Sequence, residues 1–319
     1  MDIRLESLTF LGDGLQRPEC VLATASGDLF VSDQRGVVMI GKDGTTKPIV
    51  AKDPPPGFMP NGMALLPGRA FLVANLGPTG GVYHLSQSGV LTPHLLEVDG
   101  KPLPPTNFVG IDGRGRTWIT VSTRQIPRTL AARPGAGDGF VVLLDSSGAR
   151  IVADGIGYTN EAILDASGEF LYVNETYGRC LSRYRVRGDS SLGPKEVVCT
   201  FGPGVFPDGL AHDADGFVWI VSVVSNRVIR VNPADGTAET ILDDSDPAEM
   251  AAMEAGYQAD TLDSDARSAM GARRTLANVA SISFGGSDLR SVYLGSLAGR
   301  RIASFRSPVA GMRPPHWDF

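Results

Sequence analysis

Residues 207–236 read PDGLAHDADGFVWIVSVVSNRVIRVNPADG, and this stretch decides the fold. A polar tip at Asp208 is followed by an apolar run, a DADG turn, the strand-like run at 218–220, a second turn and another strand-like run. Asp-Gly pairs supply the positive φ angles that tight hairpins need. Alternating, β-branched runs between such turns predict a unit of three short antiparallel strands.

The same template recurs along the chain. It reads PECVLATASGDLFVSD from Pro18, PNGMALLPGRAFLVAN from Pro60, TNFVGIDGRGRTWITV from Thr106, TNEAILDASGEFLYVN from Thr159 and ANVASISFGGSDLRSVYLGS from Ala277. Most units begin roughly 40 to 55 residues apart, close to the length of one propeller blade, and the last interval is about 70 residues. Six units predict an all-β fold, a six-bladed β-propeller forming a single domain over residues 1–319.

Two segments lie outside the repeat. Residues 3–11 are strand-like and precede the first unit, so we expect this N-terminal strand to complete the last blade and close the ring. The long interval contains a segment at 246–275 in which Asp246 can cap a helix. We expect a mostly helical insertion there, whose apolar stripe with Met253 and Tyr257 packs against the body or forms a lid.

Composition limits the partners. With 42% hydrophobic and 20% charged residues the chain is globular, and its net charge of −6 offers no general attraction for nucleic acid or an anionic membrane. The start MDIRLESLTFL is acidic where a signal peptide is basic, and no run reaches the ~20 apolar residues of a membrane span. We therefore expect a cytoplasmic protein with a small-molecule partner, and neither nucleic acid nor membrane as a partner.

An oxygen-bearing side chain stands at the tip of every unit. The tip residues are Glu19, Asn61, Asn107, Asn160, Asp208 and Asn278. Because the innermost strands of a propeller line its channel, equivalent tips converge on one axis, and Glu19, Asn107, Asn160 and Asp208 become candidate metal ligands. Hard oxygen donors favour one divalent metal ion, Ca²⁺ first, with Mg²⁺, Mn²⁺ or Zn²⁺ as alternatives. Asn and Asp also begin ordinary turns, but their recurrence at every tip favours the metal site.

These motifs carry a family resemblance. The stretches PEC around Glu19, TN at Asn107, TNEAILDASGEFLYVNET around Asn160 and PDGLAHDADGFVWIV around Asp208 resemble the SMP-30 (SGL) family of gluconolactonase, regucalcin and luciferin-regenerating enzyme, which includes diisopropyl-fluorophosphatase-like enzymes. The resemblance spans nearly the whole chain. It implies Glu19, Asn160 and Asp208 as metal ligands, with Asn107 as a ligand or as a contact to substrate or water.

The resemblance implies a Ca²⁺-dependent lactonase-type hydrolase acting on carboxylic ester bonds. The metal ion would polarise the carbonyl, and Asp208 would act as general base toward the attacking water. The predicted substrate contacts are Asn61, Asn107, Phe108 and Arg124. Gluconolactonase-like members usually carry Arg and Asp where this chain has Pro105 and Phe108. We therefore expect a lactone or ester less polar than a sugar lactone, because buried sugar hydroxyls without partners cost roughly 1 to 3 kcal/mol each.

Several alternatives stay open from the sequence. Arg124 and Arg128 either lie over the channel and hold a carboxylate or oxyanion, or are solvated loop cations. His212 fits a packed core residue better than a base. The same fold could also serve a non-catalytic Ca²⁺-binding or protein-binding propeller, or carry strictosidine-synthase-like or phosphotriesterase chemistry at the same site.

Overall fold

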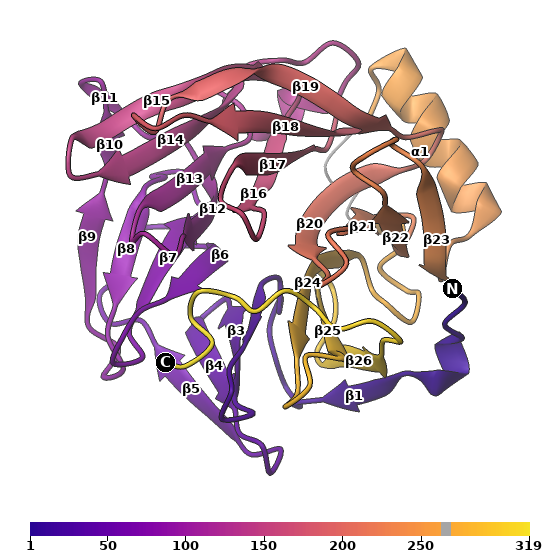
Figure 1. Cartoon of the computed structure of the whole chain (residues 1–319), viewed down its shortest axis with the longest axis horizontal. Helices are drawn as coiled ribbons and strands as arrows, with labels where there is room; N and C mark the ends of the chain where they lie inside the picture. Colours follow the sequence, from indigo (N-terminus) through magenta and orange to yellow (C-terminus); the bar gives the residue numbers. More distant parts are fainter. Residues whose placement is uncertain (263–268) are drawn as a thin grey trace.

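The computed structural model describes residues 1–262 and 269–319. Within these residues, six antiparallel four-stranded sheets stand around a central channel as the blades of a propeller (Figure 1). From the channel outwards, blades 1 to 3 consist of β2 (Val21–Ala23), β3 (Leu29–Asp33), β4 (Gly36–Ile40) and β5 (Thr46–Val50); β6 (Pro60–Leu65), β7 (Phe71–Asn75), β8 (Val82–Leu85) and β9 (Leu91–Leu95); and β12 (Thr106–Ile111), β13 (Thr117–Val121), β14 (Gly139–Asp145) and β15 (Gly148–Ile156).

Blades 4 to 6 continue the same order. They consist of β16 (Thr159–Leu164), β17 (Phe170–Glu175), β18 (Cys180–Val186) and β19 (Leu192–Thr200); β20 (Phe206–His212), β21 (Val218–Val223), β22 (Arg227–Val231) and β23 (Ala238–Asp243); and β24 (Val279–Gly285), β25 (Ser291–Ser296), β26 (Ile302–Arg306) and β1 (Thr9–Leu11). A small hairpin of β10 (Glu97–Val98) and β11 (Lys101–Pro102) lies between blades 2 and 3.

Blades 1 to 5 each have one strand more than the three that the sequence pattern predicts, whereas the fourth strand of blade 6 is the predicted N-terminal one. The additional strands are the outermost ones, and they are largely exposed. In β23, for example, only Ile241 and Leu242 are buried. A strand that buries so few residues lacks the apolar alternation by which strands are recognised in a sequence.

The N-terminal strand closes the ring, as predicted. β1 pairs antiparallel with β26, with Thr9 opposite Ser304 and Leu11 opposite Ile302. The strand is shorter than the predicted segment 3–11, because the 3₁₀ helix η1 (Leu5–Ser7) precedes it. Pairing the two ends of the chain in one sheet covers an edge that would otherwise remain open.

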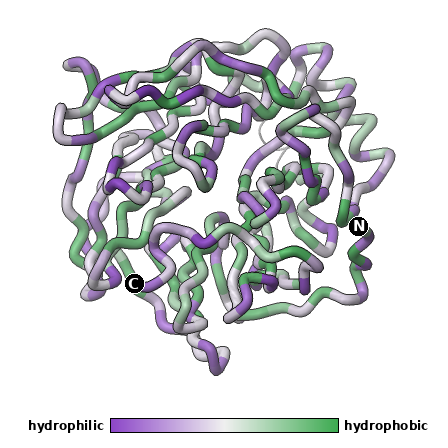
Figure 2. The backbone as a smooth tube through the Cα atoms, viewed as in Figure 1, coloured by the Kyte–Doolittle hydropathy of each residue, from purple (hydrophilic) through white to green (hydrophobic). Residues whose placement is uncertain are grey.

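Apolar side chains fill the spaces between neighbouring blades. Phe30 of blade 1 meets Phe71 of blade 2 with ring centroids 5.3 Å apart, and Trp219 of blade 5 meets Phe284 of blade 6 at 5.1 Å. Figure 2 colours the backbone by hydropathy; hydrophobic stretches alternate with hydrophilic ones, and many of the hydrophilic stretches lie at connecting turns. Each blade is therefore held by burial against its two neighbours.

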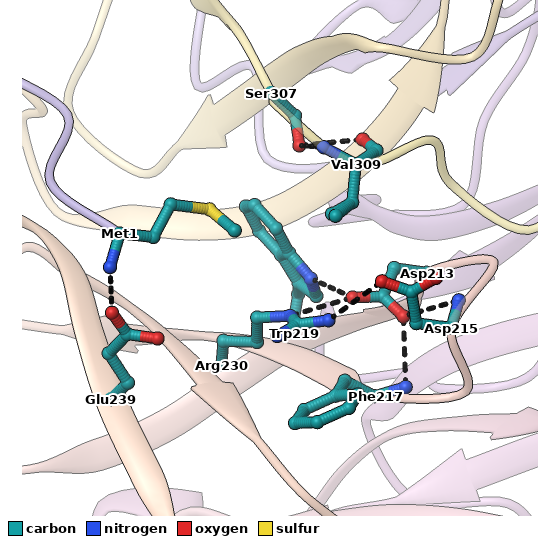
Figure 3. A network of polar contacts seen from close by, with 9 residues as sticks. All are labelled: Met1, Asp213, Asp215, Phe217, Trp219, Arg230, Glu239, Ser307 and Val309. Atoms are coloured by element: carbon teal, nitrogen blue, oxygen red, sulfur yellow. Dashed lines mark hydrogen bonds and ion pairs between the residues drawn. The ribbon is translucent and has the colours of Figure 1, made fainter.

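The DADG turn of the opening stretch is fixed by Asp213, which directly follows β20 (Figure 3). Its Oδ1 accepts hydrogen bonds from the backbone N–H groups of Asp215 at 3.0 Å and Phe217 at 2.9 Å. Its Oδ2 accepts from Trp219 Nε1 at 2.9 Å and Arg230 Nε at 2.8 Å. The turn thus satisfies a buried carboxylate completely while tying β20, β21 and β22 together.

The insertion before blade 6 contains the helix α1 (Pro247–Ala259). Asp246 caps it as predicted, accepting from the N–H of Ala248 at 2.9 Å, and Asp260 ends it in the left-handed conformation with φ 56°. Within the predicted helical insertion 246–275, α1 covers 247–259; residue 269 is helical, residues 270–275 are turns and a bend, and 263–268 lie outside the described residues. No helix in the described ranges is long and apolar enough to cross a membrane.

Candidate metal and active site

The six tip residues lie where the innermost strands begin. Asn61, Asn107 and Asn160 are the second residues of β6, β12 and β16, and Asp208 is the third residue of β20. At these tips and at the start of β24 the strand register shifts. Such irregularities interrupt the regular ladder and re-aim side chains, which frees the tips from the alternation of the strand.

All six tip side chains are buried, with exposed fractions between 1% for Asn61 and 7% for Asp208. Glu19 is 3% exposed, and a buried carboxylate of this kind requires compensation by donors or cations. Where each tip finds its hydrogen-bond partners therefore distinguishes those that serve structure from those that remain open for a ligand.

Asn61 is fully engaged within the protein. Its Nδ2 donates to Glu19 Oε1 at 2.9 Å and to the carbonyl of Asn107 at 2.8 Å, while its Oδ1 accepts from Arg17 Nη2 at 2.7 Å. Asn61 therefore positions Glu19 and the third tip. The sequence predicts a substrate contact at Asn61; in the structure its amide oxygen accepts from Arg17.

Asn278 also has a structural role. Its Oδ1 accepts from the backbone N–H of Val224 at 3.2 Å, in the turn that follows β21. The sixth tip thus supports the neighbouring blade, and its oxygen is occupied by that turn.

The remaining tips keep acceptor oxygens to spare. Asn107 Nδ2 donates to Ser122 Oγ at 3.1 Å, and Asn160 Nδ2 donates to Thr176 Oγ1 at 3.0 Å, which fixes both amides. Among the described residues, Asn107 Oδ1, Asn160 Oδ1 and Glu19 Oε2 are buried and have no hydrogen-bond partner. Three acceptor oxygens without donors in one buried region are what a bound cation would satisfy.

The electrostatics of the site also favour a bound cation. Burial raises the pKa of Glu19 to about 7, an effect partly offset by Arg17, Arg128 and the hydrogen bond from Asn61. Burial, and next the charge of Glu19, raise the pKa of Asp208 well above its usual value, against the opposing effects of Asn160, Arg128 and Arg17. Two buried carboxylates whose pKa values are both raised gain stability from a positive charge between them.

The donor set fits a hard divalent cation better than zinc. No group of three His, Cys, Asp or Glu side chains suited to a metal ion occurs in the ranges 1–262 and 269–319. The tips offer a different combination, the carboxylates of Glu19 and Asp208 with the amide oxygens of Asn107 and Asn160. Ca²⁺, Mg²⁺ and Mn²⁺ accept such all-oxygen sets, whereas Zn²⁺ prefers nitrogen and sulfur ligands.

The two arginines singled out in the sequence have different surroundings. Arg124 is exposed, pairs with Asp154 at 2.8 Å and lies over the ring of Phe140 at 4.3 Å, so no described contact brings it to the tips. Arg128 is half-buried, donates from Nε to Tyr158 Oη at 2.7 Å, and acts on the pKa of Glu19 and Asp208.

Arg17 was not predicted from the sequence as a site residue. It stands two residues before the first tip, the same repeat position at which the third unit carries Pro105. Comparing this position across all the units would have found a basic residue beside Glu19. Arg17 donates to Asn61 and lowers the pKa of both tip carboxylates, so it supplies a cation beside the tips, although at the first unit and not at the third, where gluconolactonase-like members usually carry Arg.

The helix α1 packs beside the tips of blades 4 and 5. Tyr257 donates from Oη to the carbonyl of Tyr177 at 2.7 Å and meets Phe206 edge-on at 5.3 Å. Phe206 stands two residues before Asp208, and Met253 belongs to the same apolar cluster. We call this the cap cluster; its members are Ala131, Ala132, Tyr158, Tyr177, Phe206, Val224, Met253 and Tyr257. The predicted stripe therefore does pack against the body, next to the candidate site.

Phe108, the last of the predicted substrate contacts, is buried with 6% of its surface exposed. It lines a cavity of about 600 Å³, the channel cavity, which runs along the innermost strands away from the tips. The wall begins with the residues that follow each tip, such as Cys20, Glu161 and Leu210. Glu161 was not predicted from the sequence; its Oε2 accepts from the N–H of Leu210 at 2.9 Å.

Comparison with known proteins places this geometry among relatives. A family model described as the SMP-30/gluconolactonase/LRE-like region matches residues 17–262. The Arabidopsis thaliana protein strictosidine synthase-like 13 is 27% identical over 139 residues, 42% of this chain and 34% of that protein. The match thus spans about a third of the length of this curated relative.

Solved structures show the same fold at low identity. A gluconolactonase from Xanthomonas campestris superposes with a TM-score of 0.69 at 17% identity, covering 94% of this chain and 89% of that chain. Regucalcin from Agrobacterium tumefaciens, described as a calcium-binding protein, gives 0.67 at 18% identity, covering 97% and 98%. Virginiamycin B lyase from Staphylococcus aureus gives 0.58 at 12% identity, covering 96% and 87%. At such identities these structures establish the propeller and leave the chemistry to the site.

Proposed function

The chain belongs to the SMP-30/gluconolactonase/LRE-like family, and we propose that it is a metal-dependent hydrolase that opens a lactone or a related ester. The observation that carries the proposal is the set of buried oxygens without donors, Glu19 Oε2, Asn107 Oδ1 and Asn160 Oδ1, beside the carboxylate of Asp208. A purely structural role would have supplied these atoms with donors, as it does for Asn61 and Asn278.

Glu19, Asn107, Asn160 and Asp208 would hold the metal ion, with Ca²⁺ as the preferred species. When bound, a divalent cation supplies Lewis-acid polarisation of the substrate carbonyl. The Ca²⁺-binding described for regucalcin from Agrobacterium tumefaciens supports this choice. The amide donors from Asn107 to Ser122 and from Asn160 to Thr176 would keep the two oxygens aimed at the ion before it arrives.

Asp208 would take a proton from the attacking water. Burial and the nearby Glu19 raise its pKa well above the usual value in the metal-free chain, and the positive charge of a bound metal ion would counteract this rise. Arg17 and Arg128 oppose this rise and would help to keep the carboxylate ionised. Their positive charges would also favour the negative charge that develops on the carbonyl oxygen.

The substrate would be less polar than a sugar lactone. Phe108 contributes an apolar surface directly after Asn107, and Met63 and Leu210 continue that surface along the channel. Asn107 and Phe108 are the substrate contacts that we retain from the sequence. Asn61 would act indirectly by holding Glu19, and Arg124 would contribute mainly to the surface of blade 3.

The test uses the purified full chain, stripped with a chelator and reloaded with Ca²⁺, Mg²⁺, Mn²⁺ or Zn²⁺. Acid release from a panel of lactones of graded polarity is followed by pH-stat, and melting temperature is recorded for each metal. We expect Ca²⁺ to raise the melting temperature and restore hydrolysis, with the less polar lactones opened fastest. Absence of both metal-dependent stabilisation and metal-dependent acid release would overturn the proposal.

Matched variants locate the metal site independently of turnover. Replacing Asn160 by Ala removes one of the spare oxygens, so the Ca²⁺-dependent rise in melting temperature should shrink or vanish. Asn232 lies in an exposed turn between β22 and β23, where its Oδ1 accepts from the N–H of Ala234 at 3.0 Å. Asn232→Ala should keep the full response, and an equal loss in both variants would speak against the assigned ligands.

A second candidate keeps the site and changes the reaction. The 139-residue match to strictosidine synthase-like 13 supports a synthase-type condensation in place of hydrolysis. Incubating the Ca²⁺-loaded protein with an amine and aldehyde panel, followed by mass spectrometry, separates the two reactions. Condensation products without any lactone opening would favour the second candidate.

A further inference from the structure

The channel cavity has the dimensions of a small-molecule site. Its volume of about 600 Å³ lies within the roughly 300 to 1,000 Å³ of typical ligand pockets. Its lining begins after the tips and continues to the turns at the opposite ends of β12 and β16. The tip residues themselves are not part of the wall, so this space is distinct from the candidate metal site.

The C-terminal strap, residues 311–319, crosses the channel at the end remote from the tips. Figure 1 shows this segment in yellow, running from the last blade across the face of the propeller toward β5. Met312 donates from its backbone N–H to the carbonyl of His212 at 2.8 Å, and the carbonyl of Trp317 accepts from Ala25 at 2.8 Å. The strap thus links blade 5 to blade 1 and supplies residues from Met312 to His316 to the cavity wall.

Two histidines of the wall carry an unused nitrogen. His212, at the end of β20, is 5% exposed, and His316 belongs to the strap. The Nε2 atoms of both rings are buried and have no hydrogen-bond partner among the described residues. His212 belongs to a blade and His316 to the C-terminal strap, so they are far apart in the sequence, yet both line the same cavity.

The protonation state and tautomer of the two imidazole rings make both Nε2 atoms hydrogen-bond acceptors. His212 hydrogen-bonds to the backbone of Ile163 and His316 to that of Ala23, so Nδ1 is the nitrogen that donates. Burial lowers the pKa of each ring to about 4, which leaves it neutral at physiological pH. A neutral imidazole that donates from Nδ1 presents a lone pair at Nε2.

Two acidic side chains of the wall have hydrogen-bond partners within the protein, and burial raises the pKa of Glu161 well above its usual value. Asp112 accepts from Arg116 Nε at 2.7 Å and from Trp118 Nε1 at 2.9 Å, and Glu161 accepts from Leu210. Most of the remaining surface is apolar. A ligand for this wall therefore needs an apolar body and hydrogen-bond donors, and gains little from a net charge.

We propose that the channel cavity binds a second small molecule, neutral and largely apolar, which donates a hydrogen bond from a hydroxyl or N–H group to Nε2 of His212, with Nε2 of His316 as a second acceptor. The inference goes beyond the proposed hydrolysis. The cavity shares Phe108, Met63 and Leu210 with the proposed substrate surface. The proposed contact is made at His212 and His316, at the end remote from the tips, and its readout is binding, so it can be tested without turnover.

The probes are 4-methylphenol and its methyl ether 4-methylanisole, which share an apolar ring but differ in the O–H donor. Each is titrated calorimetrically into the full chain at pH 7.5. We expect the phenol to bind at least tenfold more tightly than the ether. Binding of neither probe at millimolar concentration, as when water alone occupies the channel, would overturn the proposal.

A matched pair of variants assigns the contact. His212→Phe keeps an aromatic ring against Tyr172, whose ring lies 5.0 Å away, and removes the acceptor, so the tenfold preference should disappear. His84 lies on β8, away from the cavity wall, and His84→Phe should keep the preference. An undiminished preference in His212→Phe would contradict the assignment.

A measurement on the unmodified chain covers the case in which His212→Phe does not fold. In a long-range ¹H–¹⁵N spectrum of the imidazoles, 4-methylphenol should shift the Nε2 resonance of His212 as it accepts a hydrogen bond, whereas 4-methylanisole should not. If the phenol binds and leaves the Nε2 resonances of both cavity histidines unmoved, the proposed contact is wrong.

Discussion

Two aspartates at the two ends of one strand have opposite surroundings. Asp208 lies near the start of β20 and Asp213 directly follows its end, and both are buried, at 7% and 3% exposure. Asp213 accepts four hydrogen bonds, two from backbone N–H groups and two from the side chains of Trp219 and Arg230. Asp208 has a side-chain hydrogen bond with Asn160, and Arg128 and Arg17 act on it through their charges. Burial nevertheless raises its pKa well above the usual value.

The difference teaches how to separate structure from site in a repeated fold. A buried carboxylate that the chain satisfies stabilises the fold, and the same arrangement recurs in blade 3, where Asp112 accepts from Arg116 and Trp118. A buried carboxylate that the chain leaves short of donors costs stability and is retained at functional sites. The predictions below test this contrast, starting from the largest expected effect.

Asp208→Asn should abolish most of the lactone turnover. Loss of a general base costs roughly 10² to 10⁴ in rate, whereas removal of a poorly compensated buried charge should leave the free energy of unfolding unchanged or higher. Rates by pH-stat and urea denaturation measure the two quantities. Asp215, an exposed residue of the DADG turn, provides the control, since Asp215→Asn should alter neither. Full activity in Asp208→Asn would break the contrast.

Asp213→Ala should act in the opposite way. It leaves Arg230 and Trp219 Nε1 without their acceptor, and breaking a buried ion pair on one side costs about 3 to 5 kcal/mol of unfolding free energy. Urea denaturation followed by tryptophan fluorescence measures the loss. Activity per folded molecule should persist at low temperature, and a loss below about 1 kcal/mol would mean that the turn is not held by this carboxylate.

Glu19 should make the metal-free protein less stable as the pH rises. Its pKa is about 7 in the folded chain against 4.5 as the ordinary value, so the native state binds the proton more tightly. This contribution is fully present below pH 4.5 and is lost as the pH rises through 7, a change of about 3 kcal/mol.

The measurement compares wild type with Glu19→Gln in a chelator, by urea denaturation at a series of pH values. The variant should lack this fall in stability, and Ca²⁺ should reverse the fall in the wild type. Glu6→Gln, at an exposed position on η1, should follow the wild-type curve. Parallel curves for wild type and Glu19→Gln would show that Glu19 keeps an ordinary pKa.

The smallest expected effect is the difference in unfolding free energy between variants of Arg17 and Arg124. Arg17→Met leaves Asn61 Oδ1 without its donor in a buried place, which should cost about 1 to 3 kcal/mol of unfolding free energy. Arg124→Met breaks an exposed pair with Asp154 and should cost at most about 1 kcal/mol. Equal losses would mean that Arg17 is no more closely tied to the tips than a surface cation.

The repeat made the architecture predictable. The spacing of the tips predicted six blades, the strand-like start of the chain predicted the closing pair of β1 with β26, and Asp246 predicted the start of α1. The outermost strands of blades 1 to 5 were not predicted because they bury few residues. The end of α1 at Ala259 was not predicted, because composition does not reveal a left-handed residue such as Asp260.

The candidate site was predictable only in part. Each of the tips is indeed buried at the start of an innermost strand or directly before it, as the repeat indicated. The sequence could not tell that Arg17 occupies the oxygen of Asn61, or that Arg124 turns to Asp154 while Arg128 acts on the tips. Such distinctions depend on which donors approach from neighbouring blades, and those donors are far apart in the chain.

By itself the sequence determined the ring of blades and the residue types that meet at its axis, because period-2 patterns and turn residues act locally and the repeat multiplies them. Only the tertiary structure decided which tips keep spare oxygens, since a hydrogen bond depends on distances that no spacing encodes. It also decided that Asp208 and Asp213, which are the same residue type and are both buried, differ in the hydrogen bonds that they accept. The physical reason is that burial makes every missing donor costly, and only the packed blades determine where donors are missing.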